Sequence, residues 1–371
     1  MREEMIIAGN KDLNKAAQAK KDEFYTQLTD IEKEMRYYRA FFKDKIVFCN
    51  CDDPFESNFF KYFAMNFNSL GLKKLIATCY ATSPIVYTQL SMFGDEAVVG
   101  QESTKKKPYR IEITEVTDEN EDGRIDLADV EVLLRNRKNA LTLLKGDGDF
   151  RSAECIELLK QADVVVTNPP FSLFREFIAQ LIEYEKYFII IGNMNAIHYK
   201  EVFPLIKDNR LWIGPSIHSG DRKFNVPDDY PLNAAGCGVD ADGKKFIRVK
   251  GVRWFTNVDI EQRHEEMVLY KPYSPEIYQK YMNYDAINID SVSDIPYDYF
   301  DNMGVPDSFL DQYNPDQFEI VGLGCGDLAK QIGIKKNYRG RTDLAYVKEG
   351  KEKCPYSRII IRRKQVNSNK N

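Results

Sequence analysis

Residues 164–171 read Val-Val-Val-Thr-Asn-Pro-Pro-Phe, an apolar, β-branched run that stops at an amide and two prolines. The run is short enough to be a buried strand. Apolar residues at helical spacing follow it, at Leu173, Phe174, Phe177, Ile178, Leu181 and Ile182. The stretch therefore predicts a strand–turn–helix unit whose turn is Asn168, Pro169, Pro170 and Phe171. In open α/β sheets this carboxyl edge of a strand is where ligands bind.

The turn carries groups that suit a planar amine. Two prolines fix the backbone and remove two N–H donors, which leaves carbonyl oxygens as acceptors. Asn168 adds a side-chain acceptor, and Phe171 offers a flat ring for stacking. The tetrapeptide resembles the Asn-Pro-Pro-Phe/Tyr signature of amino-directed methyltransferases that use S-adenosylmethionine. The alternative is an ordinary strand-ending turn, since Asn-Pro is a common turn dipeptide.

Strand and helix patterns alternate around this unit. Apolar runs at 45–50, 75–80 and 188–192 predict further buried strands, and 57–67 predicts a helix between the first two. This alternation indicates an α/β fold with a parallel, doubly wound sheet through about residue 215. Residues 81–140 have mixed composition and are predicted to form an insertion.

Composition divides the chain into three parts. Residues 1–21 are a lysine-rich arm, 22–215 hold the strand–helix alternation, and 216–371 are predicted to form a second domain. The net charge is −5, yet residues 327–371 hold 13 Lys and Arg against four Asp and Glu. Such asymmetry favours a polyanionic partner for the basic tail, with a solvated basic surface as the alternative.

Bulk composition excludes several classes of protein. No stretch approaches the roughly 20 apolar residues that span a bilayer, and the first residues lack the apolar core of a signal peptide. The seven cysteines are irregularly spaced and form neither a disulfide framework nor a repeated CxxC zinc pattern. We therefore expect no membrane partner and a reducing, cytoplasmic location.

Three segments carry candidate cofactor contacts. The turn after the first strand of a doubly wound sheet meets a nucleotide-like ligand, and here it holds Asn50, Cys51, Asp52 and Asp53. Its carboxylates suit a cationic amino-acid group. The other contacts are Tyr25 and Thr26 upstream, and Asp149 and Phe150 downstream. Each segment also fits an ordinary turn. Ser57 and Asn58 stand where such methyltransferases usually have a glycine-rich stretch.

Longer strings extend the resemblance over most of the chain. They are residues 22–27, 47–54, 57–63, 71–76, 146–152, 165–175, 199–203, 284–288 and 315–320. With these strings the chain resembles the EcoRI-type adenine-specific DNA methyltransferases. The resemblance implies a Rossmann-like class I sheet in an S-adenosylmethionine-binding domain at 22–215. It also implies a C-terminal target-recognition region at 216–371, and methyl transfer to N6 of an adenine flipped out of duplex DNA.

The resemblance also implies residue roles. Asn168 and Pro169 correspond to acceptors for the target amine, Phe171 to the stacking platform, and Asp53 and Asp149 to cofactor contacts. The second strand ends without the acidic residue that often holds the cofactor ribose, so that contact is unassigned. Phosphate contacts are expected from 244–253 and the basic tail. The DNA site, a restriction partner and the oligomeric state stay open, and a monomer is compatible with the sequence.

Other functions remain open from the sequence. The same signature occurs in methyltransferases that act on RNA bases or on a protein glutamine amide. A catalytically inactive, methyltransferase-like DNA-binding protein is a further alternative. The intact tetrapeptide favours an active enzyme, and the long strings favour DNA.

The insertion contains a candidate calcium loop. Its acidic and amide residues have EF-hand spacing, at Asp118, Asn120, Asp122, Asp126 and Asp129. The loop ends in Asp where Glu is usual. A structural calcium ion is therefore one hypothesis, and a solvated acidic turn is the other.

Overall fold

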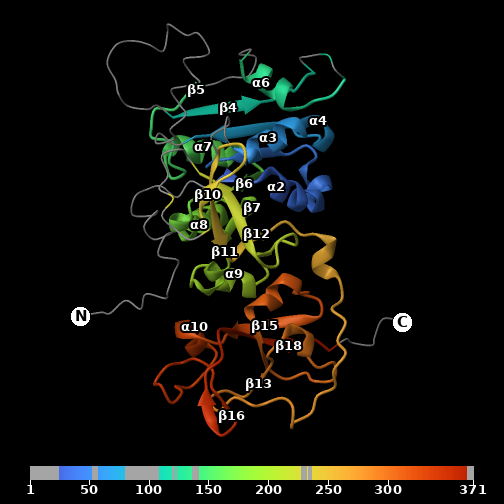
Figure 1. Cartoon of the computed structure of the whole chain (residues 1–371), viewed down its shortest axis with the longest axis vertical. Coiled ribbons are helices and arrows are strands. Elements are labelled where there is room, and N and C mark those ends of the chain that lie inside the picture. The colour runs from blue at the N-terminus through green and yellow to red at the C-terminus, as the bar shows by residue number, and fades with distance from the viewer. Residues whose placement is uncertain are drawn as a thin grey trace, which may run out of the picture. The chain divides into compact units, whose positions relative to one another are not determined.

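The computed structural model describes residues 25–51, 57–79, 108–118, 121, 123–135, 142–226, 232 and 236–365. The chain folds into two compact units. The N-terminal unit comprises residues 1–194 and 219–258, and the C-terminal unit comprises 195–218 and 259–371. Figure 1 traces the elements of both units. The domain boundary predicted at residue 215 does not coincide with the boundary between these units, because residues 219–258 belong to the N-terminal unit.

A mixed sheet forms the centre of the N-terminal unit, with its strands in the order β5-β4-β3-β2-β6-β7-β12. β3, β2, β6 and β7 are parallel to one another, whereas β4 runs antiparallel to β3 and β12 runs antiparallel to β7. The bounds are β2 (Ile46–Cys49), β3 (Lys74–Thr78), β4 (Tyr109–Ile113), β5 (Thr142–Leu143), β6 (Val164–Thr167), β7 (Tyr187–Asn193) and β12 (Val252–Thr256).

The α/β class and the buried strands are confirmed, but the expectation of a purely parallel sheet is wrong. β4 comes from the predicted insertion and β12 from the predicted second domain, and each adds antiparallel to one side of the parallel core. The alternation of strands and helices along 22–215 could not predict β12, because β12 lies later in the chain and pairs with β7. The parallel pairs still bring the carboxyl ends of β3, β2, β6 and β7 to one sheet edge.

The two helices predicted from apolar spacing, at 57–67 and after Phe171, are present as α3 and α8. The described helices of this unit are α2 (Leu28–Met35), η1 (Arg36–Phe42), α3 (Asn58–Met65), α4 (Phe67–Leu70), α6 (Leu127–Arg135), α7 (Ala153–Gln161), η3 (Phe171–Leu173) and α8 (Phe174–Glu183). α4 ends at Gly71, whose φ of 64° is a left-handed cap that glycine adopts without strain. β4 precedes the calcium candidate along the chain, and α6 begins within it.

Aromatic pairs join helices to the sheet in the core of this unit. Phe42 and Phe63 meet edge to face with centroids 5.0 Å apart, and Phe59 meets Trp254 of β12 at 5.8 Å. Such pairs stabilise by about 0.5–1.5 kcal/mol beyond the area they bury. The helix after β2 is thereby fixed against β12.

A second, smaller sheet in the N-terminal unit joins distant parts of the chain. Its order is β1-β9-β11-β10, from β1 (Tyr25–Thr26), β9 (Asp221–Asn225), β10 (Gly238–Val239) and β11 (Lys245–Lys250). Tyr25 and Thr26 lie opposite Asn225 and Phe224. Gln27 Nε2 also donates to Asn225 Oδ1 at 3.2 Å.

The C-terminal unit is built on a sheet of order β13-β14-β18-β15. Its elements are α9 (Phe203–Lys207), β8 (Trp212–Ile213), η5 (Glu261–His264), β13 (Ile287–Asn288), η6 (Val292–Asp294), β14 (Met303–Pro306), η7 (Asp307–Gln312), β15 (Phe318–Leu323), α10 (Gly326–Gln331), β16 (Tyr346–Lys348), β17 (Lys351–Lys353) and β18 (Arg358–Arg363). η4 (Met194–His198) lies at the unit boundary. A buried cluster beside β18 contains Tyr281, Ala286, Ala329, Ile334, Leu344, Tyr346 and Ile360.

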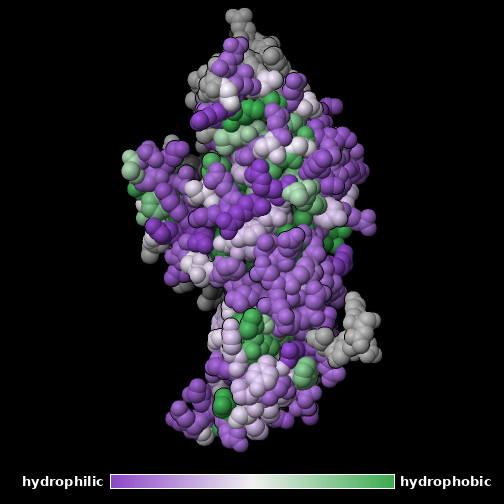
Figure 2. All heavy atoms as spheres, turned by 90° about the vertical axis from the view of Figure 1, so that its right-hand side faces the viewer, coloured by the Kyte–Doolittle hydropathy of each residue, from purple (hydrophilic) through white to green (hydrophobic). Residues whose placement is uncertain are grey.

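The surface is predominantly hydrophilic on the face drawn in Figure 2. A mean hydropathy of −0.47 agrees with this view. None of the helices in the described part of the chain has the length and apolar composition needed to cross a membrane.

Candidate active site

The residues that follow β2 and β6 lie at the same edge of the central sheet. β2 pairs in parallel with β3 on one side and with β6 on the other, so Asn50 and Asn168 leave neighbouring strands in the same direction. Asn50 is buried, with 2% of its surface exposed, and Cys51 is half-buried. The predicted cofactor residues Asp52 and Asp53 lie outside the described residues.

Thr26 lies beside the start of the helix that follows β2. Asn58, the first residue of α3, donates from Nδ2 to the Thr26 carbonyl oxygen at 2.7 Å. The Thr26 side chain is buried, and its Oγ1 has no hydrogen-bond partner among the described residues. A buried hydroxyl without a partner costs about 1–3 kcal/mol, which a polar ligand at this position would offset. The Thr26 hydroxyl is therefore suited to a hydrogen bond with a polar cofactor.

Ser57, which stands where a glycine is usual, caps the helix that follows β2. Its Oγ accepts hydrogen bonds from the backbone N–H groups of Phe59 and Phe60, at 3.1 and 3.4 Å. Ser57 is thus the N-cap of α3, and Asn58 supplies the contact to β1 described above. The departure from the usual pattern replaces glycines with two hydrogen-bonding side chains.

The segment that contains Asp149 lies against the end of β3. Gly148 has φ 78°, and a Cβ there would lie 2.2 Å from the Cys79 carbonyl oxygen, so only glycine fits. Cys155 Sγ donates to the Gly148 carbonyl oxygen at 3.6 Å. Burial raises the pKa of the Cys155 thiol, which keeps it protonated and unsuited to nucleophilic attack.

Asp149 and Phe150 are both engaged in contacts within the protein. Arg151 binds both Asp149 oxygens, with Nε 2.9 Å from Oδ1 and Nη2 2.7 Å from Oδ2, and these bonds raise the Arg151 pKa. Arg151 Nη1 also reaches Glu176 of α8 at 2.6 Å. The buried Phe150 ring meets Phe177 edge to face at 5.0 Å, and the Arg151 guanidinium lies 5.2 Å from its centroid. The segment is therefore tied to α8.

The Asn168–Phe171 turn is held between β6 and α8. Pro169 is buried, while Asn168, Pro170 and Phe171 are half-buried. The Leu173 N–H donates to the Pro170 carbonyl oxygen at 3.0 Å, which starts η3. The Phe171 ring meets Phe224 of β9 nearly perpendicularly, with centroids 6.4 Å apart. The turn predicted to bind the target therefore contacts the strand that pairs with β1.

A glycine in β7 sets the position of α8. A Cβ at Gly192 would lie 2.5 Å from the Phe174 ring and 2.9 Å from Phe255 of β12. The rings of Phe174 and Phe255 pack edge to face at 5.1 Å. Since Phe174 begins α8 directly after η3, this contact fixes the helix that supports the Asn168–Phe171 turn.

Four supporting residues were not predicted from the sequence, namely Asn58, Gly148, Gly192 and Phe224. A signal existed for Gly192, because an isolated glycine in a strand pattern indicates close backbone approach. Asn58 stood where the glycine-rich pattern was broken. No local signal identified Phe224, whose contact to Phe171 depends on the tertiary fold.

The structure gives the calcium hypothesis no support. Asp126 Oδ1 accepts from the Ala128 N–H at 2.7 Å, and Asp129 Oδ2 accepts from the Asp126 N–H at 2.9 Å. Both carboxylates thus cap the start of α6 in an arrangement similar to a capping box, and Asp129 is buried. Asn120 and Asp122 lie outside the described residues. Among those described, no group of three or more His, Cys, Asp or Glu side chains could hold a metal ion.

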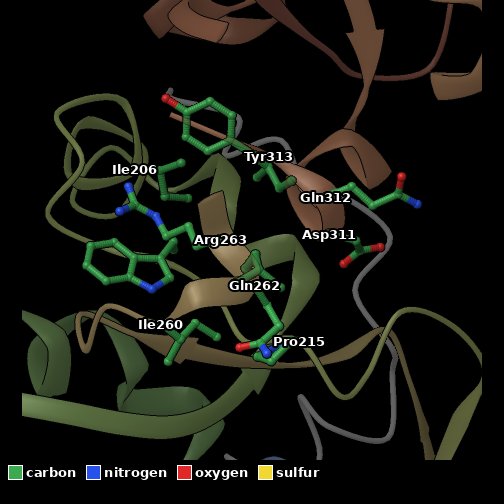
Figure 3. A pocket seen from close by; sticks show the side chains of 11 residues that line it. Ile206, Pro215, Ile260, Gln262, Arg263, Asp311, Gln312 and Tyr313 are labelled. Carbon is green, nitrogen blue, oxygen red and sulfur yellow. The ribbon is translucent and has the colours of Figure 1, made fainter. Parts of the chain in front are cut away.

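The C-terminal unit holds a small cavity, shown in Figure 3. Ile206, Arg263 and Tyr313 line it, and the Arg263 guanidinium lies 3.9 Å from the Trp212 ring centroid. Its volume is about 40 Å³. Pockets that enclose small molecules typically measure 300–1,000 Å³, so this cavity does not accommodate a nucleobase.

Comparison with known proteins agrees with this arrangement. A model of the family described as "Adenine-specific methyltransferase EcoRI" matches residues 12–364. The chain is 44% identical over 361 residues to "Type II methyltransferase M.EcoRI" of Escherichia coli, covering 97% of this chain and 98% of that protein. It is 35% identical over 359 residues to "Type II methyltransferase M.MpnI" of Mycoplasma pneumoniae, covering 95% and 98%.

A third relative, "Type II methyltransferase M.MgeORF184P" of Mycoplasma genitalium, is 35% identical over 358 residues, covering 95% of this chain and 99% of that protein. No solved structure matches the chain significantly. The family match spans both compact units and every described segment of the candidate site. The chain therefore belongs to the EcoRI family of adenine-specific methyltransferases.

Proposed function

We propose that this chain methylates N6 of an adenine within one recurrent sequence of duplex DNA, with S-adenosylmethionine as methyl donor. Family membership supports adenine-specific methyl transfer to DNA. One observation supports the proposed use of S-adenosylmethionine and N6 of adenine. Four segments lie around one edge of the central sheet, namely Tyr25–Thr26, the residues after β2, the turn after β6, and the Gly146–Phe150 loop. The type II names of the relatives support a modification enzyme.

The cofactor side of the site is proposed to comprise Tyr25, Thr26, Asn50, Cys51, Asp52, Asp53, Asp149 and Phe150. S-adenosylmethionine supplies an electrophilic methyl group when bound. The Thr26 hydroxyl, buried and without a partner among the described residues, supports a polar contact there. A Rossmann-like class I fold is the architecture that we propose for this unit, on the basis of the parallel strands β3, β2, β6 and β7.

The target side is proposed to comprise Asn168, Pro169, Pro170 and Phe171. An adenine inside a duplex cannot reach this turn, so the base must flip out, which costs a few kcal/mol of unstacking. The Asn168 side-chain oxygen and the Pro169 carbonyl accept hydrogen bonds from the amine and orient its lone pair. Phe171 stacks on the base. Catalysis is then largely positional and needs no covalent nucleophile.

DNA-sequence recognition is proposed to lie in residues 216–371, after the catalytic residues 22–215. Residues 219–258 of this predicted recognition region pack within the N-terminal unit. Arg253, expected among the phosphate contacts, is buried on β12. We therefore propose that base reading lies mainly in the C-terminal unit, residues 195–218 and 259–371.

The test is incubation with labelled S-adenosylmethionine and unmethylated duplex DNA, RNA or protein in parallel, followed by nucleoside and peptide mass spectrometry. N6-methyladenine in duplex DNA at one recurrent sequence is the expected product. Asn168→Ala should abolish transfer yet retain binding of S-adenosylhomocysteine. Asn68→Ala on α4 removes only a hydrogen bond to the Val116 carbonyl oxygen, and it should leave transfer unchanged. Label in RNA or in a glutamine side chain would overturn the substrate, and absence of cofactor binding would indicate an inactive relative.

A further inference from the structure

The loop between α10 and β16 of the C-terminal unit concentrates exposed cations. Residues 335–341 read Lys-Lys-Asn-Tyr-Arg-Gly-Arg, and we refer to them as the cationic loop. All four of its basic side chains, Lys335, Lys336, Arg339 and Arg341, are exposed. Tyr338 stands among them with 49% of its surface exposed.

Asn337 holds the backbone of the cationic loop from inside. Its Oδ1 accepts from the N–H groups of Arg339 and Arg341, at 2.8 and 3.3 Å, and its Nδ2 donates to the Asp343 carbonyl oxygen at 3.0 Å. The Asn337 N–H donates to the Arg341 carbonyl oxygen at 2.8 Å. Gly340, with φ 72°, supplies the left-handed residue of this turn. The loop is therefore a defined turn with its charged side chains outside.

The two ends of the cationic loop are anchored in the core of the C-terminal unit. Ile334 precedes the loop and Leu344 follows it shortly after, and both belong to the buried cluster beside β18. Asn283 Nδ2 donates to the carbonyl oxygens of Lys335 and Asp343, at 2.8 Å each. These contacts fix the loop before any partner binds, which lowers the entropy cost of binding.

Within the cationic loop the Arg339 guanidinium lies 5.1 Å from the Tyr338 ring centroid, but the charges of the loop have no acidic partner among the described residues. None of its four cations forms an ion pair with a described residue. Lys271 and Lys330, also exposed in this unit, lie 2.5 Å from Asp294 and Asp327. In a chain of net charge −5, a cluster of exposed cations without internal acidic partners is available to an external anion.

A lysine face on the β16–β17 hairpin extends this charge. Lys348 lies opposite Lys351 and Tyr346 opposite Lys353, so the three lysines share one face of the hairpin with the buried Tyr346, whereas Glu352 lies on the other with Val347. Lys351 and Lys353 are exposed and Lys348 is half-buried. Asn337 Nδ2 lies 3.3 Å from Sγ of Cys354, the residue after β17. The cationic loop and the end of the hairpin are thus adjacent.

We propose that the cationic loop, continued by the lysine face of the hairpin, binds the sugar-phosphate backbone of duplex DNA and fixes the orientation of the C-terminal unit on it. This inference rests on the proposed function. Arginine presents a planar fork of donors that matches a phosphate, and lysine acts as a point charge. The Tyr338 hydroxyl is a further phosphate donor. A fixed loop suits a contact that sets position rather than reads sequence.

The experiment compares the full-length wild type with the double variant Arg339→Gln/Arg341→Gln on a fluorescent duplex of random sequence at several salt concentrations. Each phosphate contact contributes about 0.9 to the slope of log affinity against log salt, so we expect the slope to fall by about 2. Affinity at low salt should fall on the order of tenfold, for random and methylatable duplexes alike. Binding of S-adenosylhomocysteine should not change.

Two further variants make the result specific. Lys330→Gln removes an exposed lysine that is paired with Asp327 in the same unit, and it should leave both affinity and salt slope unchanged. Asn337→Ala retains every cation but removes the bonds that order the turn. It should weaken binding several-fold while the salt slope stays near the wild-type value. Wild-type affinity in Asn337→Ala would overturn the claim that the loop is preorganised.

The failure of this inference is distinguishable from failure of the proposed function. If the wild type methylates duplex DNA and the double variant binds DNA with unchanged affinity and slope, the cationic loop is not the phosphate contact. If the wild type transfers methyl groups to RNA or protein instead, the proposed substrate itself is overturned. Circular dichroism and the urea midpoint of each variant confirm that the comparison is between folded proteins.

Discussion

The rings of Phe171 and Phe224 lie nearly perpendicular, at 88°, with their centroids 6.4 Å apart. Phe171 ends the Asn-Pro-Pro-Phe turn after β6, whereas Phe224 belongs to β9 and lies directly opposite Thr26 of β1. The ring proposed to stack on the target base therefore rests on the strand that also pairs with the proposed cofactor segment. This contact couples the two halves of the site.

Phe224→Leu should impair the chemical step more than cofactor binding. An edge-to-face pair contributes about 0.5–1.5 kcal/mol, so a loss of a few-fold to about tenfold in the single-turnover methylation rate is expected. Phe246→Leu is the matched control, because Phe246 lies on the other face of the same small sheet, opposite Asn225. Equal single-turnover rates for both variants would show that Phe224 does not position Phe171.

We expect Thr26→Val to weaken cofactor binding without lowering the free energy of unfolding. The valine side chain has nearly the same shape, but it removes a buried hydroxyl that has no partner among the described residues. The free energy of unfolding of the ligand-free protein should therefore stay constant or rise, since an unsatisfied buried hydroxyl costs about 1–3 kcal/mol. Calorimetric affinity for S-adenosylhomocysteine should fall several-fold. Thr29→Val, exposed on α2, serves as control, and equal affinities in both variants would remove Thr26 from the cofactor contacts.

His264 forms a pH-dependent link within the C-terminal unit. Its Nδ1 lies 2.6 Å from Asp316 Oδ2 and its Nε2 lies 2.9 Å from Asp259 Oδ2, while Arg263 also binds Asp259. The hydrogen bonds to Asp316 and then to Asp259 raise the pKa of His264 above its ordinary value of about 6.5. The folded state therefore favours the protonated imidazole. The stabilisation is complete below about pH 6.5 and is lost as pH rises through the folded-state pKa.

His264→Gln should accordingly destabilise the protein more at pH 6 than at pH 9. The difference in urea midpoint between wild type and variant should shrink over this range, and it should be modest because the groups are largely exposed. Asp316→Asn retains the imidazole but removes its principal partner, so an NMR titration should place its pKa nearer to 6.5. A pH-independent difference between wild type and His264→Gln would contradict the assignment.

The sequence predicted the parallel core of the sheet and the sheet edge at which the candidate residues Asn50 and Asn168 lie. The strand at Val164–Thr167 has the predicted bounds, and the turns that hold Asn50 and Asn168 lie at one sheet edge, as strand alternation implies. These features depend on local apolar spacing and on the general rule that parallel strands end on the same side. The family resemblance identified the chemistry independently of the geometry.

Long-range pairings could not be predicted in the same way. β9 and β12 return from residues 219–258 to β1 and β7, and no local pattern states which distant strand an apolar run will pair with. The acidic spacing around Asp129 fits both a calcium loop and the carboxylates that cap α6, so spacing alone could not distinguish the two. The sequence indicated the basic composition of the cationic loop but not its defined turn. That turn depends on hydrogen bonds from Asn283 and Asn337.

Gly192→Ala tests whether the packing of α8 controls the target-binding turn. The added Cβ would lie 2.5 Å from the Phe174 ring, and β7 cannot retreat because it pairs with β6 on one side and β12 on the other. The ring must therefore move, and with it the start of α8. Overpacking of this kind costs about 1–3 kcal/mol of unfolding free energy, measurable by urea denaturation.

The same variant should lose methylation activity beyond its loss of stability. Phe174 lies directly after η3, so its displacement shifts Asn168 and Phe171, while Thr26 and the turn after β2 stay in place. We expect a large fall in single-turnover rate with nearly unchanged affinity for S-adenosylhomocysteine. Adding Phe174→Leu makes room for the methyl group, so the double variant should recover part of both losses. Strictly additive costs in this double-mutant cycle would show that the two residues do not act through their contact.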